Sequence, residues 1–260
     1  MLPRPPAVLT YHALGTRLPR EQDPANLVVP PEAFRSQLLS MRRRGYEFIR
    51  LLDFAAELEN GSPPKGVCAV TFDDGTLDNL TILEPILRQL QVPATVFACP
   101  GLLGEPHPDI APEAGVRLLD EDELRQLDQS PWVEIGSHTS EHTELVDADA
   151  GEALRLMTES RVQLEGLLDH PVVSFAYPNC TYSASCPEAA GKAGYEVAVT
   201  CGQRGGWKRY ELHRELIDGL DSRLSFELKA RGVFFRLYES PFGRLGRWAV
   251  RSRRHPDSVR

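Results

Sequence analysis

Short apolar runs alternate with longer amphipathic stretches along most of this chain. The runs at residues 8–11, 67–72 and 94–98 have the length and composition of buried strands. In the stretches between them, such as 31–45 and 150–168, apolar residues recur at the spacing of one helix face. Strands separated by helices in this way form parallel sheets or barrels, so the alternation predicts an α/β fold.

The rest of the chain continues the same alternation. We expect further strands at residues 46–51, 133–136, 172–176, 196–200 and 212–217. We expect further helices at residues 52–58, 77–90, 121–127 and 187–193. Residues 100–120 are rich in Gly and Pro, which predicts a long loop able to border a site.

The length of the chain, 260 residues, fits one large domain with a substantial core. We expect that domain at residues 1–235 and a separate tail at 236–260. The tail holds seven arginines against two acidic residues, whereas the whole chain has a net charge of −8. Either the tail contacts an anionic membrane surface weakly or it is a solvated terminus. The negative net charge argues against a general nucleic-acid binder.

The cysteines and the N-terminus bear on the compartment. We expect no disulfide framework in a chain of this length, and therefore a reducing compartment. Only Cys180 and Cys186 are close enough in sequence to pair casually. The first six residues are too short and too proline-rich for a signal peptide, and no stretch approaches about 18 apolar residues. These features predict a cytoplasmic protein.

Two aspartates and a glycine, Asp73, Asp74 and Gly75, directly follow the predicted strand 67–72. In βα folds the carboxyl ends of the strands gather on the face where active sites form. Neighbouring side chains of a strand point to opposite faces, so both carboxylates enter one site only if the chain leaves extended geometry there. Gly75 permits such a turn. A plain surface turn is the alternative for these residues on their own.

Two histidines, His138 and His142, follow another predicted strand end further along the chain. Their i, i+4 spacing places both imidazoles on one face of a helix, where they can bind one ion. One carboxylate and two imidazoles can hold a divalent metal, and the second carboxylate is then free to move a proton. Three protein ligands also leave coordination positions open, as a catalytic metal needs. We therefore expect a metal-activated hydrolase.

The order of these motifs resembles that of the polysaccharide deacetylases, which form the NodB-homology family or carbohydrate esterase family 4. Three segments carry the resemblance: Thr71-Phe72-Asp73-Asp74-Gly75, His138-Thr139-x-x-His142 and Phe175-Ala176-Tyr177-Pro178. The early Tyr11-His12 pair is similar to the start of the biofilm-type branch. The resemblance implies a distorted (β/α)7 barrel that hydrolyses N-acetyl groups on sugars with the help of a metal.

The resemblance also implies a role for each motif residue. Asp73 is expected to be the general base, and Asp74, His138 and His142 are expected to bind the metal. Zn²⁺ suits a site of two histidines and one aspartate, and Co²⁺, Ni²⁺ or Mn²⁺ would also serve. Thr139 is expected to hold its loop by hydrogen bonding.

The chain departs from the family in the third motif. It reads Tyr-Pro-Asn-Cys at residues 177–180, where family members commonly have Tyr-Pro-Tyr-Gly or Arg-Pro-Pro-Tyr-Gly. We expect the backbone N–H of Asn179 to donate to the oxyanion of the reaction. Because this motif contains no arginine, Arg214 is the candidate to orient the base. A surface salt bridge is the alternative role for Arg214.

The general acid is expected to be a histidine. The resemblance to the branch that begins with Tyr-His favours His12, and His213 is the alternative. His12 would otherwise be a hydrogen-bonded histidine at a strand end. The other histidines lie beside prolines in predicted loops or in the tail, and we expect no chemical role for them: His107, His170 and His255.

These features together predict a carbohydrate N-deacetylase whose substrate is an N-acetylated sugar or glycan. Two alternatives stay open. The same metal chemistry would serve the hydrolysis of another amide, such as a formamide or a cyclic imide. The altered third motif would suit a catalytically silent sugar-binding module, although Asp73, Asp74, His138 and His142 are all present.

Overall fold

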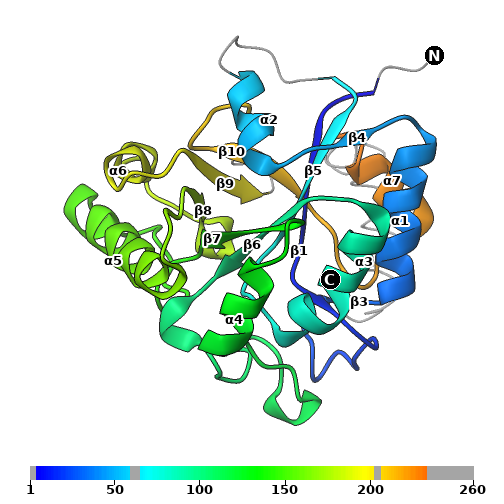
Figure 1. Ribbon diagram of the computed structural model, residues 1–260, viewed down its shortest axis with the longest axis horizontal. Helices are drawn as coiled ribbons and strands as arrows, with labels where there is room; N and C mark the ends of the chain where they lie inside the picture. The colour runs from blue at the N-terminus through cyan, green and yellow to red at the C-terminus, as the bar shows by residue number, and fades with distance from the viewer. Residues whose placement is uncertain (1–3, 59–64, 202–205, 233–260) are drawn as a thin grey trace, which may run out of the picture.

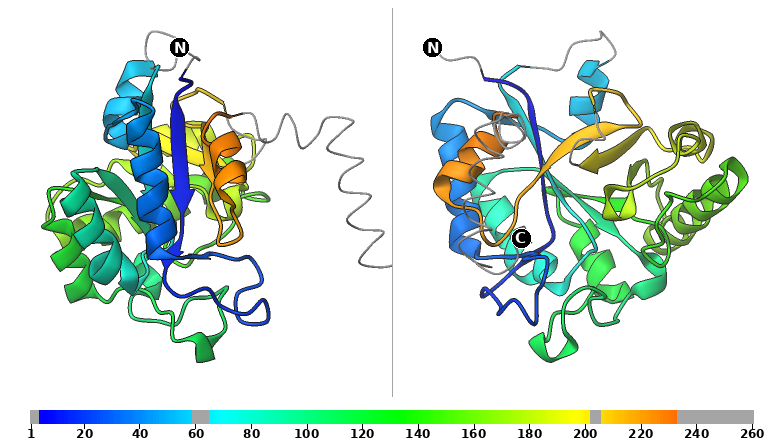
Figure 2. Two further views of the ribbon diagram at one scale, coloured as in Figure 1. Left: turned by 90° about the vertical axis from the view of Figure 1, so that its right-hand side faces the viewer. Right: turned by 180° about the vertical axis from the view of Figure 1, so that it is seen from behind.

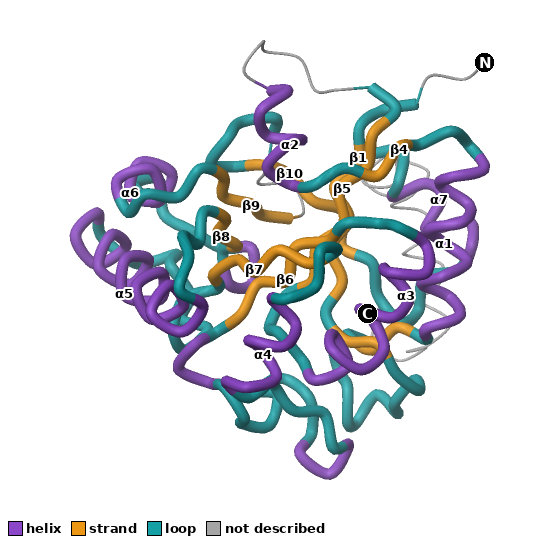
Figure 3. Tube along the Cα trace, in the orientation of Figure 1, coloured by secondary structure: helices purple, strands orange, loops and turns teal. Residues whose placement is uncertain are grey.

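The computed structural model describes residues 4–58, 65–201 and 206–232. In this part of the chain, parallel strands form a central barrel that helices surround (Figures 1 and 3). The strands follow one another around the ring as β1-β5-β6-β7-β8-β9-β10, and β10 pairs with β1 to close it. They are β1 (Ala7–Tyr11), β5 (Val67–Phe72), β6 (Ala94–Ala98), β7 (Val133–Ser137), β8 (Ser174–Ala176), β9 (Val197–Cys201) and β10 (Leu212–Leu216). The predicted (β/α)7 barrel is confirmed, and the expected tail at 236–260 lies outside the described residues.

Three further strands are only two residues long. β4 (Glu47–Phe48) pairs with β5 outside the ring, within the longer strand predicted at 46–51. β2 (Ala13–Leu14) and β3 (Val28–Val29) form a separate pair. The apolar pattern did not predict β2 or β3, because a run of two residues is too short to show a period.

The helices agree closely with the predicted stretches, except that α7 was not predicted. They are α1 (Pro31–Arg43), α2 (Leu51–Glu57), α3 (Glu84–Leu90), α4 (Glu121–Asp128), α5 (Ala150–Leu168), α6 (Cys186–Lys192) and α7 (Arg223–Lys229), with the π-helical segment η2 (Asn79–Leu83) before α3. Side-chain caps define where some begin: Asp149 accepts from the Glu152 N–H at the start of α5. Among the described helices, none has the length and apolar content that a membrane crossing requires.

The barrel interior changes from apolar to polar along its strands. Residues two apart on a strand share one face, so the side chains of alternate residues fill the interior. At the amino-terminal end, Val8 and Ala69 pack in one buried cluster with Phe54 of α2. Further along the same faces come Asp73, which follows β5, and Arg214 of β10, and both are buried. The apolar end therefore closes the barrel, and the polar end forms the floor of a site.

Two long loops pack together at the carboxyl end of the barrel. One connects β2 to β3 and covers residues 15–27, and the other lies between β6 and α4 at residues 103–118. The Ala111 N–H donates to the Gln22 carbonyl at 2.8 Å, and Ile110 is buried in a cluster with Leu27 and Val28. Figure 2 (left) shows β1 pointing toward these loops. They border the end of the barrel where the predicted site residues lie.

Candidate active site

A cavity of about 400 Å³ opens at the carboxyl ends of the strands. The residues predicted for the site enter it from four strand ends. Lining side chains include His12 after β1, Asp73 and Asp74 after β5, His138 and His142 after β7, and Asn179 after β8. The structure thus brings into one cavity six of the seven residues predicted for the site. The seventh, Arg214, lies beneath it.

The turn after β5 places both aspartates in this cavity. The Asp73 N–H still donates to the Tyr11 carbonyl at 2.9 Å, as a strand residue would. The chain then leaves extended geometry, with φ of 72° at Asp74 and 71° at Gly75. A Cβ at Gly75 would lie 3.3 Å from the Ala98 Cβ, so β6 also favours glycine here. The predicted departure from extended geometry is confirmed, and it begins one residue earlier, at Asp74.

Arg214 holds Asp73 from below the cavity. Its guanidinium donates to both carboxylate oxygens, at 2.6 and 2.7 Å, and also to Thr71 Oγ1 at 3.1 Å. The Arg214 side chain is fully buried, so the alternative of a surface salt bridge is wrong. Burial raises the pKa of Asp73, but the Arg214 charge and hydrogen bonds outweigh it and hold that pKa below its usual range. Asp73 is therefore an ionised, oriented carboxylate at neutral pH.

Asp74, His138 and His142 form a group that could hold a metal ion. Asp74 Oδ1 lies 3.6 Å from Nε2 of each histidine, and the three ligand atoms lie within 4.8 Å of one another. His138 Nδ1 donates to the Ala176 carbonyl at 2.8 Å, which leaves the lone pair on Nε2. Burial lowers the pKa of His138 to about 4, so the imidazole is neutral at pH 7.

Asp74 Oδ1 gives this group its strongest indication of a cation. This oxygen is buried and has no hydrogen-bond partner among the described residues. A buried carboxylate oxygen without a donor is costly unless a cation compensates it. One oxygen and two imidazole nitrogens match the ligands of catalytic zinc sites, so the residues fit a divalent ion.

The loop that carries the two histidines is not the predicted helix. Residues 138–144 are irregular, and Thr139 and His142 have left-handed φ values of 61° and 54°. The expectation of a shared helix face is therefore wrong, although the two rings do meet, with centroids 4.9 Å apart. Thr139 Oγ1 accepts from the Thr143 N–H at 2.8 Å, so Thr139 does hold the loop by hydrogen bonding.

The third motif forms a tight turn after β8. Asn179 and Cys180 both have left-handed backbone geometry, with φ of 50° and 55°. Cys180 stands where family members commonly have glycine, the residue that adopts this geometry without strain. The Asn179 side chain donates to Glu144 Oε1 at 2.8 Å, and Asn179 lines the cavity. The turn therefore has left-handed backbone geometry at a position where this chain has no glycine.

Cys180 forms a disulfide with Cys201, with 5.3 Å between their Cα atoms. The expectation that no disulfide would form is wrong, and so is the pairing of Cys180 with Cys186, which is a free, buried thiol. The reason is topological. β8 and β9 are adjacent parallel strands, so the turn after β8 lies beside the last residue of β9. Both half-cystines line the cavity.

The two candidates for the general acid occupy different places. His12 lines the cavity, and its buried Nδ1 has no hydrogen-bond partner among the described residues. His213 precedes Arg214 on β10, so strand alternation directs it out of the barrel, where its Nε2 lies 3.2 Å from Glu215 Oε1. The geometry thus favours His12 over His213.

Asp78 and Asn79 fix the segment that carries His12. Asp78 Oδ2 accepts from the Leu14 N–H at 2.6 Å, and Asn79 Nδ2 donates to the His12 carbonyl at 3.5 Å. Asp78 is half-buried, and burial raises its pKa to about 6. These residues support the site and do not line the cavity.

Asp78 predicts a pH dependence of stability. Its folded pKa of about 6 lies above the ordinary value of 3.8, so the folded state binds the proton more tightly than the unfolded state does. Its stabilisation is complete below pH 3.8 and is lost as pH rises through 6, up to about 3 kcal/mol. In urea unfolding, Asp78→Asn should therefore gain stability relative to the wild type between pH 4 and pH 7. A difference between the two proteins that does not change with pH would contradict this.

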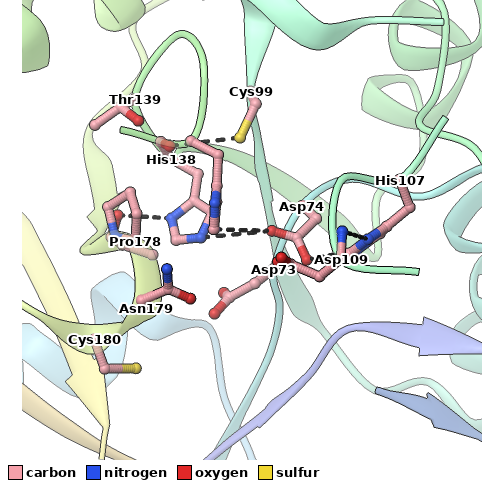
Figure 4. Close-up of polar contacts among 12 residues, drawn as sticks. Asp73, Asp74, Cys99, His107, Asp109, His138, Thr139, Pro178, Asn179 and Cys180 are labelled. Atoms are coloured by element: carbon pink, nitrogen blue, oxygen red, sulfur yellow. Dashed lines mark hydrogen bonds and ion pairs between the residues drawn. The ribbon is translucent and has the colours of Figure 1, made fainter. Parts of the chain in front are cut away.

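One buried histidine beside the site was not expected there. His107 lies in the loop 103–118 and is 2% exposed. Its Nε2 is 3.0 Å from Asp74 Oδ2 (Figure 4). His107 does lie in a loop, as expected, but that loop brings it into contact with Asp74, which the expectation of no chemical role did not foresee. The one signal in the sequence was that the glycine- and proline-rich loop around it could border the site.

The fold and the site together define a parallel (β/α)7 barrel with a potential metal-binding group at its carboxyl end. The sequence model of the family described as "Polysaccharide deacetylase" matches residues 60–198, more than half of the chain. This chain therefore belongs to the polysaccharide deacetylase family, the NodB-homology or carbohydrate esterase 4 group. The predicted family is confirmed.

Individual relatives agree with this assignment. The chain is 26% identical over 212 residues to Bacillus subtilis (strain 168) YxkH, provisionally named a polysaccharide deacetylase, covering 80% of this chain and 69% of that protein. The solved structure of Streptococcus pyogenes deacetylase PplD, in complex with acetate, is similar with a TM-score of 0.71 and 26% identity. That likeness covers 88% of this chain and 98% of PplD.

A third relative carries a substrate in its name. The poly-beta-1,6-N-acetyl-D-glucosamine N-deacetylase of Escherichia coli (strain K12) is 30% identical over 118 residues. This match covers 43% of the present chain and 17% of that protein. The two proteins therefore share only part of their length.

Proposed function

We propose that this chain is a metal-dependent N-deacetylase of carbohydrates. One observation carries the proposal: a carboxylate held ionised by Arg214 shares a cavity with the Asp74, His138 and His142 group. The first can accept a proton and the second can hold a cation, which are the two requirements of metal-assisted hydrolysis. The relatives support the choice of acyl group, since PplD was solved with acetate and the Escherichia coli relative is named for an N-acetylated polymer.

Asp74, His138 and His142 would hold the ion. We take Zn²⁺ as the ion because two imidazoles and one carboxylate are a common zinc ligand set, which Co²⁺, Ni²⁺ and Mn²⁺ can also occupy. When bound, the ion polarises the acyl carbonyl and lowers the pKa of water. The neutral His138 is ready to bind without losing a proton first.

The remaining residues would move protons and stabilise charge. Asp73, aligned by Arg214, accepts a proton from water as the water oxygen attacks the acyl carbon. The backbone N–H of Asn179 donates to the oxyanion that forms. His12 then protonates the nitrogen as the carbon–nitrogen bond breaks, which yields acetate and a free amine. This assignment gives each of the predicted site residues a role and favours an enzyme over a silent binding module.

The test is acetate release from N-acetylated oligosaccharides by protein stripped of metal and then reloaded with Zn²⁺. We expect acetate only from the reloaded protein, and we expect removal of the ion by a chelator to stop it. A formamide and a cyclic imide serve as competing substrates in the same assay. Faster hydrolysis of either one than of every N-acetyl sugar would replace the deacetylase proposal with another amide hydrolase.

A further inference from the structure

Each carboxylate oxygen of Asp74 faces different histidines. Its Oδ1 faces His138 and His142 without a hydrogen bond. Its Oδ2 lies 3.0 Å from Nε2 of His107, whose side chain is fully buried. Figure 4 shows Asp74 between His138 and His107. One oxygen of this carboxylate is therefore hydrogen-bonded, and the other is not.

The tautomers of the flanking histidines are opposite. The Asp109 N–H donates to His107 Nδ1 at 3.1 Å, so Nδ1 is an acceptor and the ring proton is on Nε2. His107 thus donates Nε2–H to Asp74. His138 instead gives its Nδ1 proton to the Ala176 carbonyl and turns a lone pair toward Asp74. A histidine that presents a proton to the carboxylate cannot bind the ion through the same nitrogen, so His107 lies beside the ligand set and is not part of it.

The loop that carries His107 is held at several points. The His107 N–H donates to the Val116 carbonyl at 3.0 Å, and the Leu118 N–H donates to the Glu105 carbonyl at 2.9 Å. The same loop is bound to the loop between β2 and β3 through the Ala111 N–H, which donates to the Gln22 carbonyl. His107 therefore has a fixed position from which its proton can orient a neighbour.

We propose that His107 is a positioning residue for Asp74. Its Nε2–H occupies Oδ2 and sets the plane of the carboxylate, which leaves Oδ1 as the oxygen that binds the ion. The inference rests on the proposed metal-dependent function, because it assigns a partner to one of the proposed ligands. Outer partners that orient a metal ligand contribute about 10- to 100-fold to metal affinity.

Two substitutions separate this role from simple packing. Glutamine at position 107 is long enough to bring an amide N–H to Asp74. Asparagine is one methylene shorter, so its amide oxygen can still accept from the Asp109 N–H while its amide nitrogen falls short of Asp74. His107→Asn should therefore keep the loop and lose the donor, whereas His107→Gln should keep the donor.

The measurement is the Zn²⁺ affinity of the metal-free proteins, obtained by competition with a chelator. We expect His107→Asn to bind Zn²⁺ about 10- to 100-fold more weakly than the wild type. We expect His107→Gln to stay close to the wild-type affinity. His170→Asn is the matched control, because His170 contacts Asp128 at 2.9 Å in an exposed pair before β8, at the opposite end of the barrel. It should bind Zn²⁺ like the wild type.

Thermal melts of the metal-free variants check folding, and His107→Ala is a second variant without the donor. If the wild type binds Zn²⁺ and His107→Asn or His107→Ala binds it equally well, the positioning role is overturned and the proposed function stands. An equal loss in His107→Gln and His107→Asn would overturn it as well. A wild-type protein that binds no Zn²⁺ would overturn the proposed function and this inference together.

Discussion

Asp73→Asn should lower the rate of acetate release by about 100- to 10,000-fold while the protein still binds its metal ion. The side chain is the proposed base, and its two oxygens are aligned by the buried guanidinium of Arg214. Asparagine has nearly the same shape but cannot accept a proton from water. Asp74, His138 and His142 are untouched by the change, so metal content should stay at the wild-type level.

A control is needed because Asp73→Asn leaves the Arg214 charge buried without its partner. An unpaired buried charge of this kind destabilises a fold by about 3–5 kcal/mol. The double variant Asp73→Asn/Arg214→Met removes both charges and should recover stability in urea unfolding without recovering activity. Full activity in metal-loaded Asp73→Asn would remove Asp73 from the role of base.

His138→Ala should abolish both metal binding and activity. Its Nε2 is one of the three proposed ligand atoms, and partners that only orient such ligands already contribute about 10- to 100-fold to affinity. Loss of a ligand itself should therefore weaken Zn²⁺ binding by more than about 100-fold. Metal content after dialysis and the rate of acetate release measure the two effects on the same sample.

His213→Ala is the matched control for this variant. His213 lies on a strand of the same barrel, but its imidazole contacts Glu215 on the outer face. It should keep both the metal and the activity, which would also remove the alternative of His213 as the general acid. Wild-type metal affinity in His138→Ala would contradict the ligand assignment.

The regular part of the fold could be predicted from the sequence. The strand at 67–72 and the helix at 150–168 have the bounds that the apolar pattern indicated, because a full-length run or stripe shows its period clearly. The helix α7 (Arg223–Lys229), which Ser222 caps, was not predicted, whereas α2 and α6 have the same length of seven residues and were predicted. Length therefore accounts for the well-predicted elements but does not explain why α7 was missed.

The sequence predicted which residues share the cavity, but it did not predict the backbone of the loop that carries the two histidines. The spacing of His138 and His142 indicated a helix, yet left-handed geometry at Thr139 and His142 brings the rings together in a loop. Arg214 was named with a surface alternative, and only the alternation of β10 directs it beneath Asp73. Local spacing in the sequence cannot place Arg214 beneath Asp73, because that position depends on which strands become neighbours.

The same reason explains what the sequence did not reveal. Cys180 and Cys201 are 21 residues apart, and they meet only because β8 and β9 are adjacent in the barrel. His107 reaches Asp74 across 33 residues through a loop with no regular pattern. Contacts between strand ends and loops depend on which residues of neighbouring strands pair. The sequence predicted the closed barrel but not this pairing.

The central claim is that one divalent ion, held by Asp74, His138 and His142, is required for deacetylation. It is tested most directly by titrating Zn²⁺ into metal-free protein and measuring acetate release from an N-acetylated oligosaccharide at each step. The rate should rise in proportion to bound Zn²⁺ and level off at one ion per chain. A full rate in the metal-free protein, or no acetate at any loading, would contradict the claim.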